Sequence, residues 1–284
     1  MAHIAFLGTG LLGSAFAEAA VRRGDTVTAW NRSPEKVLAL AQFGVEAAPT
    51  PAAAVQGAAR VHLVLKDDAV VEEVIAAARS GLSADAILID HTTTLPRFTA
   101  ERAERLQAQG VKYLHCPVFM GPPAARNAQG LMMAAGPRAL FESVQADLAR
   151  MTGRLDYLGE RNDLAAVDKL LGNAMIIGVW AAMADVLTLA KACGVDGKDA
   201  VGLLGAIDMN AMVARRGTTM VAGDFTPNFE LAMARKDVQL MLEASGVLPM
   251  AVLPAIAERM DRLIAAGHGA KDAGVLAIDA LRAA

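Results

Sequence analysis

The sequence predicts an α/β protein in which a doubly wound parallel sheet is followed by an all-helical domain. Three observations carry this prediction. Short apolar runs alternate with helical patterns through the first half of the chain, as in the βα units of a parallel sheet. A glycine-rich turn, GTGLLG, follows the first apolar run. The strand patterns stop after Glu160, where a long apolar helical stretch begins.

The length and composition allow two domains and exclude several classes of partner. The chain has 284 residues, and we place the boundary so that residues 1–161 form the first domain and residues 162–284 the second. It is 54% hydrophobic but only 4% aromatic, so small aliphatic side chains must fill the core. A net charge of -3 provides no basic face, and we expect no nucleic-acid partner.

The chain also lacks the patterns of secretion, membrane insertion and metal binding. Its beginning, MAHIAFLGTG, enters a strand pattern directly, so we expect a cytoplasmic protein. The apolar run Leu170–Ala184 is shorter than the roughly 20 residues that span a bilayer, so we expect no membrane partner. Neither the two cysteines nor the five histidines have metal-ligand spacing, and no metal is expected.

The GTGLLG turn predicts a dinucleotide-binding site. It lies between a strand pattern, His3–Leu7, and a helical pattern that ends at Gly24, and a second strand pattern, Thr26–Trp30, follows. Glycines allow the backbone to turn tightly and approach a pyrophosphate at the helix N-terminus, which is the Rossmann arrangement. The expected cofactor contacts in the turn are Gly8, Thr9, Gly10, Leu11, Leu12 and Gly13.

The residues after the second strand favour NADP over NAD. An NAD site usually has an acidic residue here that binds the ribose 2′-hydroxyl. This chain has Asn31, Arg32 and Ser33 instead, with no acid before Glu35. A guanidinium with two hydrogen-bonding neighbours suits a 2′-phosphate, so we expect NADPH as the cofactor.

Further strand patterns at 61–65, 86–90 and 112–119 end in polar loops, at 66–70, 91–96 and 117–123. In doubly wound sheets, ligands bind at the carboxyl ends of the strands. We therefore expect these loops to form the site.

The long helix predicted over residues 162–194 is apolar almost all round, so its own chain or a partner must bury it. We expect a homodimer or homotetramer. Lys169 and Asn173 lie four residues apart and therefore on one face. An ammonium beside an apolar wall is costly without a partner or a function. The alternative is a structural one, a lysine extended to the surface and an asparagine bonded to a loop.

The chain resembles the β-hydroxyacid dehydrogenase family, which includes 3-hydroxyisobutyrate dehydrogenase and tartronate semialdehyde reductase. The resemblance covers essentially the whole chain. It rests on GTGLLG, NRS, HTTTLP, CPVFMGPP, KLLGN and FELAMARKD, in that order. It implies an NADP-dependent enzyme that transfers a hydride between the nicotinamide and a small 3-hydroxy acid or aldehyde-acid.

The resemblance also implies roles for individual residues. Lys169 would be the general acid/base, and Asn173 would orient the substrate. Further cofactor contacts would be Leu65, Lys66, Thr93 and Lys236. The substrate contacts would be Phe119, Met120, Gly121, Phe229 and Asp237.

One departure from the family pattern concerns the substrate. The family has Ser-Gly-Gly where this chain has Phe119, Met120 and Gly121, and two bulky apolar side chains cannot hold a carboxylate as a hydroxyl does. An imine (C=N) reductase on the same scaffold is therefore an alternative, although it has less need of a base such as Lys169. A non-catalytic NADP-binding protein is a third reading.

Overall fold

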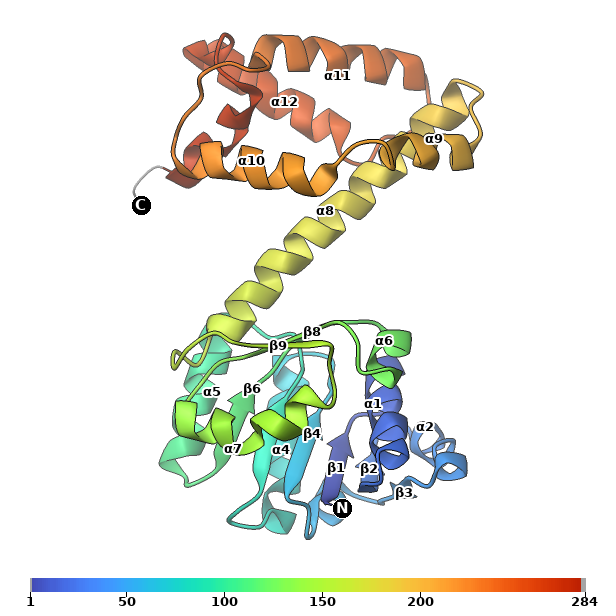
Figure 1. The fold of residues 1–284 in the computed structure, drawn as a ribbon, viewed down its shortest axis with the longest axis vertical. Helices are drawn as coiled ribbons and strands as arrows, with labels where there is room; N and C mark the ends of the chain where they lie inside the picture. The colour runs from blue at the N-terminus through green and yellow to red at the C-terminus, as the bar shows by residue number, and fades with distance from the viewer. Residues whose placement is uncertain (1, 282–284) are drawn as a thin grey trace. The chain divides into compact units, whose positions relative to one another are not determined.

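The computed structural model describes residues 2–281, which form two compact units that divide between Asn173 and Ala174 (Figure 1). The division lies inside helix α8, Leu164–Ala192. It is twelve residues later than the predicted boundary after residue 161. The reason is that the first turn of α8 packs on the first unit, where Ala165 and Ala166 are fully buried.

The first unit contains the predicted doubly wound sheet. Its strands lie in the order β3-β2-β1-β4-β5-β6, and every neighbouring pair is parallel. The order reverses between β1 and β4, which is the point where such sheets bind ligands. The strands are β1 His3–Leu7, β2 Thr26–Trp30, β3 Glu46–Ala47, β4 Arg60–Leu63, β5 Ile87–Asp90 and β6 Lys112–His115.

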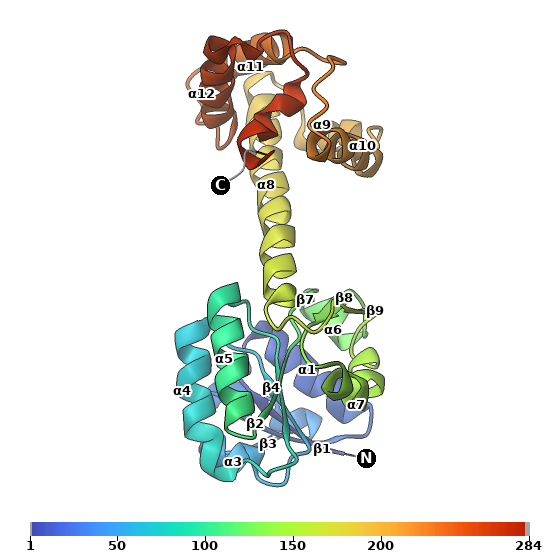
Figure 2. The same cartoon turned by 90° about the vertical axis from the view of Figure 1, so that its left-hand side faces the viewer.

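Helices cover both faces of this sheet (Figure 2). One face carries α3 Pro51–Val55, α4 Asp68–Ala78 and α5 Pro96–Ala108, and the other carries α1 Leu11–Arg22 and α7 Arg138–Ala149. The alternation of β1 explains the two layers, because Ile4 and Phe6 belong to the core under α1 whereas Ala5 and Leu7 belong to the core under α4. The shorter helices are α2 Pro34–Leu38, η1 Ala41–Phe43, η2 Arg79–Gly81 and α6 Pro122–Arg126.

A small second sheet corrects one sequence prediction. Residues 112–119 were expected to form one strand, but the chain leaves the large sheet after His115, and β7 (Val118–Phe119) pairs with β8 (Leu131–Ala134). Pro117 has no amide hydrogen to continue a ladder, which accounts for the break. Strand β9, Arg154–Tyr157, completes the sheet in parallel with β8.

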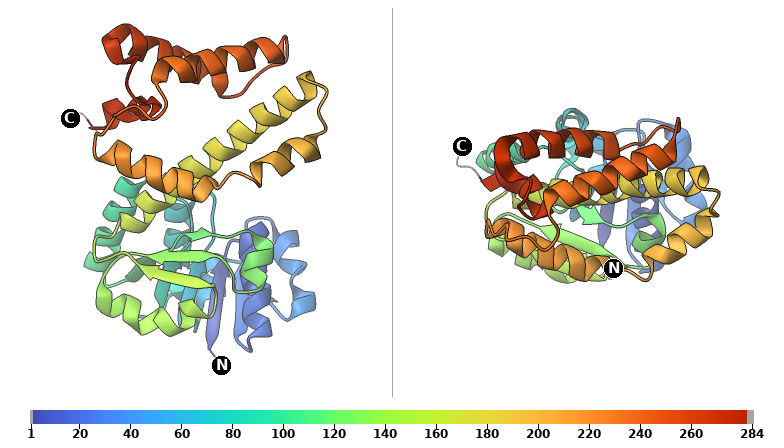
Figure 3. Two further views of the ribbon diagram at one scale, coloured as in Figure 1. Left: turned by 45° about the horizontal axis from the view of Figure 1, so that its top comes forward. Right: turned by 90° about the horizontal axis from the view of Figure 1, so that it is seen from above.

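The second unit is all-helical, as predicted (Figure 3). Its buried core comes from α11, α12 and η4, and α8 contributes no residue to it in the described chain. Asp185 of α8 accepts the backbone N–H groups of Ala251, Val252 and Leu253 at the start of α12. The elements are α9 Gly197–Leu204, α10 Met209–Val221, α11 Leu231–Ser245, α12 Leu253–Leu263, η3 Ile264–His268 and η4 Ala273–Leu281.

Helix α8 leaves a large apolar surface exposed. Trp180 is 68% exposed, and Leu171, Met175 and Ile177 are each more than half exposed. Within residues 2–281, α8 is the one helix that is long and apolar enough to cross a membrane by length and composition. A soluble helix that a second protein chain covers has the same composition.

We expect a second copy of the chain to cover this surface, because Ile177 and Trp180 otherwise leave a large apolar patch in water. Light scattering at micromolar concentration, without detergent, should give twice the chain mass of 29.5 kDa or a larger multiple. Ile177→Glu combined with Trp180→Glu should lower that mass. A wild-type mass of one chain would contradict the expectation.

Candidate active site

The glycine turn brings β1, α1 and β4 into close contact. Gly8 has φ +101°, and a Cβ built on it would lie 2.3 Å from the carbonyl oxygen of Val64. A Cβ on Gly13 would lie 2.1 Å from the carbonyl oxygen of Gly8. Neither position accepts a side chain. A Cβ on Gly10, by contrast, would meet no atom within 4 Å, so the turn is open on that side.

The N-terminus of α1 has unused hydrogen-bond donors that fit a phosphate. Gly10 is the N-cap and provides no side-chain cap, and the first helical bond runs from the Ser14 amide to Gly10. The amides of the first three helical residues, 11–13, therefore have no helical acceptor. The buried Thr9 hydroxyl also has no partner. Donors at a helix N-terminus next to an open glycine form an anion site.

A cavity of about 290 Å³ lies beside this turn. Seven of the residues expected to contact the cofactor line it, namely Gly8, Gly10, Asn31, Arg32, Ser33, Leu65 and Lys66. Thr9, Leu11, Leu12 and Gly13 belong to the turn, but none of them lines the cavity. The cavity and the turn thus match the adenosine and pyrophosphate ends of a dinucleotide.

Asn31, directly after β2, has a structural role in the site. Its side chain accepts a hydrogen bond from the Thr9 amide at 3.0 Å and donates one to the carbonyl oxygen of Ser33 at 3.1 Å, so it joins the glycine turn to the turn after β2. Lys36 also lines the cavity, and sequence reasoning missed it. Its spacing of four residues from Arg32 was the available signal. Arg32 and Lys36 are both cations in the lining of the cavity, which suits a 2′-phosphate.

Buried histidines support the loop that carries Thr93. The His91 ring bonds to the carbonyl oxygen of Cys116 at 2.6 Å and to the His62 ring at 2.9 Å. Since a carbonyl only accepts, His91 donates through Nδ1 and accepts from Nδ1 of His62 through Nε2. Burial lowers the pKa of His91 to about 4 and the pKa of His62 well below its ordinary value, so both rings are neutral at pH 7. Thr93 itself is exposed.

Lys169 and Asn173, the two residues predicted to be catalytic, lie together in the structure. The Lys169 ammonium donates to Asn173 Oδ1 at 3.0 Å. The same nitrogen lies 4.0 Å from the centroid of the Phe119 ring. Burial lowers the Lys169 pKa. A Cβ on Gly172 would lie 2.2 Å from Phe119 Cζ, so this glycine is what lets the ring lie against α8.

The two apolar residues that replace the family's Ser-Gly pair have different environments. Phe119 packs in a small cluster with Leu164 and Ala165 and contacts Lys169. Met120 packs against the main core of the first unit. Phe119 is therefore the one of the pair that faces Lys169. Gly121 follows as the N-cap of the short helix α6.

Two polar residues close to this loop in sequence, Arg126 and Asn127, have their own partners. The Arg126 guanidinium is paired with Glu18 at 2.6 Å, and Asn127 donates to the carbonyl oxygen of Pro123.

Three expected site residues belong to the second unit, where they are arranged on α11 and the loop before it. Phe229 is 41% exposed. Lys236 and Asp237 are partly exposed and form an ion pair at 2.8 Å. Asp272, which sequence reasoning missed, accepts the amides of Asn228 and Phe229 and so holds the loop that carries Phe229. The roles of Phe229, Lys236 and Asp237 remain predictions.

A glycine turn on the first strand, an open cavity beside it and a half-buried lysine define an NAD(P)-binding oxidoreductase. Residues 3–159 match the model of the NAD-binding domain of 6-phosphogluconate dehydrogenase. Residues 165–278 match the model described as NAD-binding of NADP-dependent 3-hydroxyisobutyrate dehydrogenase. The chain belongs to the β-hydroxyacid dehydrogenase family.

Curated relatives cover most of the chain. An uncharacterized oxidoreductase of Shewanella frigidimarina is 28% identical over 89% of this chain and 90% of its own length. The uncharacterized oxidoreductase YfjR of Bacillus subtilis is 27% identical over 88% of this chain and 90% of its own length. Human cytokine-like nuclear factor N-PAC is 26% identical over 84% of this chain, which spans only 44% of that protein.

Solved structures share the fold at low identity. A reductive aminase from Aspergillus terreus, in complex with NADPH and ethyl levulinate, has a TM-score of 0.89 and 23% identity, covering 99% of this chain and 100% of its own. An imine reductase from Pseudomonas sp. has a TM-score of 0.88 and 21% identity, covering 99% of each chain.

NADPH should bind at least about tenfold more tightly than NADH, a difference of roughly 1.4 kcal/mol. The physical reason is the pair of cations, Arg32 and Lys36, at the cavity where NAD enzymes have an acid. Arg32→Ala should remove most of this preference, whereas Arg97→Ala, which removes an exposed cation on α5, should leave it intact. Fluorescence titration of both cofactors measures it. Equal wild-type affinities would show the assignment to be wrong.

Proposed function

We propose that this protein is an NADP-dependent reductase or dehydrogenase of a small aldehyde-acid or 3-hydroxy acid, in which Lys169 is the general acid/base. The observation that carries the proposal is the hydrogen-bonded pair of Lys169 and Asn173, half-buried beside an aromatic ring. The family supports hydride transfer, and the pair supports a carbonyl or hydroxyl as the reacting group.

The roles of the residues follow from this geometry. When bound, the nicotinamide cofactor supplies or accepts the hydride. In reduction, the Lys169 ammonium donates a proton to the carbonyl oxygen, which becomes the hydroxyl of the product. In oxidation, the neutral amine removes the hydroxyl proton. The side-chain amide oxygen of Asn173, Oδ1, accepts from the Lys169 nitrogen and holds it in place. The NH₂ group of the same Asn173 side chain is a donor suited to the substrate oxygen.

The burial of Lys169 fits this role. Because a half-buried ammonium loses part of its hydration, its pKa falls below the ordinary lysine value. A lower pKa places the proton exchange closer to neutral pH, where general acid/base catalysis is most efficient. A surface lysine would remain an ammonium and would be a poor base.

The chain's own residues also fit NADP(H). The open Gly10, the unpartnered Thr9 hydroxyl and the N-terminus of α1 would hold the pyrophosphate. Arg32 and Lys36 would hold the 2′-phosphate.

An imine reductase is the second candidate, and Phe119 is the observation that favours it. The ring places an apolar wall 4.0 Å from the Lys169 nitrogen, where the family pattern has a serine hydroxyl. A substrate without a carboxylate suits such a wall. Several proteins with this fold are named as imine reductases. The presence of Lys169 supports the carbonyl reading, because a C=N reductase has less need of a base that acts on a hydroxyl.

Oxidation of NADPH against a panel of semialdehydes, ketones and cyclic imines separates these functions. We expect the highest kcat/KM with a semialdehyde. Phe119→Ser should then raise kcat/KM for the acid relative to an uncharged aldehyde of similar size. A preference for cyclic imines would support the second candidate. NADPH binding without turnover of any compound would indicate the non-catalytic reading.

Lys169→Ala should abolish turnover and leave NADPH binding nearly unchanged, since the residue acts on the substrate. The matched control is Lys191→Ala, the same substitution in the last turn of α8, which should keep wild-type kinetics. Steady-state rates and cofactor titration provide the two readouts. A Lys169→Ala variant with a near wild-type rate would overturn the proposed role.

A further inference from the structure

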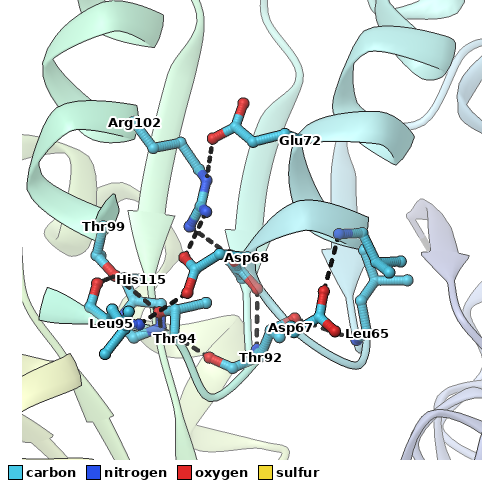
Figure 4. Close-up of polar contacts among 12 residues, drawn as sticks. Leu65, Asp67, Asp68, Glu72, Thr92, Thr94, Leu95, Thr99, Arg102 and His115 are labelled. Atoms are coloured by element: carbon cyan, nitrogen blue, oxygen red, sulfur yellow. Dashed lines mark hydrogen bonds and ion pairs between the residues drawn. The ribbon is translucent and has the colours of Figure 1, made fainter. Parts of the chain in front are cut away.

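Two reciprocal hydrogen bonds join the loop after β4 to the loop after β5 (Figure 4). The Leu65 amide donates to Thr92 Oγ1 at 3.1 Å. The Leu95 amide donates to Asp68 Oδ2 at 2.9 Å. Each bond joins a backbone amide of one segment to a side chain of the other, and Asp68 is the first residue of α4 directly after the loop. We call this pair of bonds the loop latch.

The Asp68 side of the latch is tied to a buried cation. The other oxygen of Asp68 accepts from Arg102 at 2.7 Å, and the Arg102 side chain is fully buried. Arg102 also donates to Glu72 at 2.8 Å and lies 3.6 Å from Asp90. A buried guanidinium with three carboxylates in reach has little freedom to move, so it fixes Asp68 in turn.

The Thr92 side is held from both directions. Its amide donates to Asp90 Oδ1 at 2.9 Å, and its carbonyl oxygen accepts from His115 Nε2 at 2.9 Å. Thr92 and Thr94 are buried, while Thr93 between them is exposed. The latch and its supports therefore fix the backbone on both sides of Thr93.

The latch also fixes one wall of the cofactor cavity. Val64, Leu65 and Lys66 line the cavity of about 290 Å³ together with Gly8 and Gly10 of the glycine turn. Leu65 Cδ2 would lie 3.0 Å from a Cβ on Gly8, so this loop packs directly on the turn. If the Leu65 amide lost its acceptor, residues 64–66 would gain conformational freedom. Cofactor binding would then have to order them, and its affinity would fall.

We propose that Thr92 and Asp68 are positioning residues for NADP(H). Their two hydrogen bonds hold residues 64–66 of the cavity wall and the loop that carries Thr93 in fixed positions before the cofactor binds. This inference rests on the proposed function only through the identity of the cofactor. Neither residue needs to touch the cofactor.

The test compares two substitutions at Thr92. Thr92→Val keeps the shape of the side chain but removes the hydroxyl that accepts from the Leu65 amide, whereas Thr92→Ser retains that hydroxyl. Thr92→Val should weaken NADPH binding about five- to tenfold, the effect of one lost hydrogen bond, whereas Thr92→Ser should stay within about twofold of wild type. Asp68→Ala, which breaks the other bond, should act in the same direction. Fluorescence titration of NADPH measures these affinities without turnover.

A structural control separates positioning from stability. Thr28→Val removes the hydroxyl of another buried threonine, which donates to the carbonyl oxygen of Ala54 and also bonds to the His3 ring. It should lower the free energy of unfolding without changing the Kd for NADPH. Amide hydrogen exchange at Leu65 should accelerate in Thr92→Val and remain slow in Thr28→Val.

The outcomes are distinct. Thr92→Val with wild-type affinity and slow exchange at Leu65 would overturn the latch. Equal weakening by Thr28→Val would assign the effect to stability and overturn the positioning role. A wild-type protein that binds no NADPH would overturn the cofactor assignment and this inference with it. Turnover of imines instead of semialdehydes would overturn only the proposed substrate and leave the latch supported.

Discussion

The close approach of the glycine turn to the end of β4 is the constraint on which the cofactor site depends. A Cβ on Gly8 would lie 2.3 Å from the carbonyl oxygen of Val64, and a Cβ on Gly13 would lie 2.1 Å from that of Gly8. Because these positions have no side chain, β1, α1 and β4 meet at the switch point of the sheet. The turn is open at Gly10, and the loop that contains Leu65 lines the cavity beside it.

Much of the fold and of the cofactor site was predictable from the sequence because the signals were local. The βα alternation predicted the parallel sheet, and GTGLLG predicted the tight turn at its switch point. The four-residue spacing of Lys169 and Asn173 predicted their shared face, and the structure joins them by a hydrogen bond. In each case a short segment contains all the residues that determine the geometry.

What the sequence did not reveal depends on contacts between distant segments. The latch joins Leu65 to Thr92 across two strands, and no local pattern marks such a bond. The different directions of Phe119 and Met120 follow from pairing in the small sheet and from the bare Gly172 on α8. The structure divides into compact units twelve residues after the predicted boundary, because the first turn of α8 packs on the first unit and no sequence pattern marks such packing.

The central claim is that Lys169 moves the proton, and the pH dependence of kcat/KM in both directions tests it most directly. The Lys169 ammonium is half-buried beside the Phe119 ring, and burial lowers its pKa from the ordinary value of 10.5. Semialdehyde reduction needs the ammonium, so its kcat/KM should fall as the pH rises through this pKa. Oxidation of the hydroxy acid needs the free amine, so its kcat/KM should rise through the same pKa. Mirror-image limbs with one shared pKa below 10.5 are the predicted result. Profiles with no common ionisation in the two directions would contradict it.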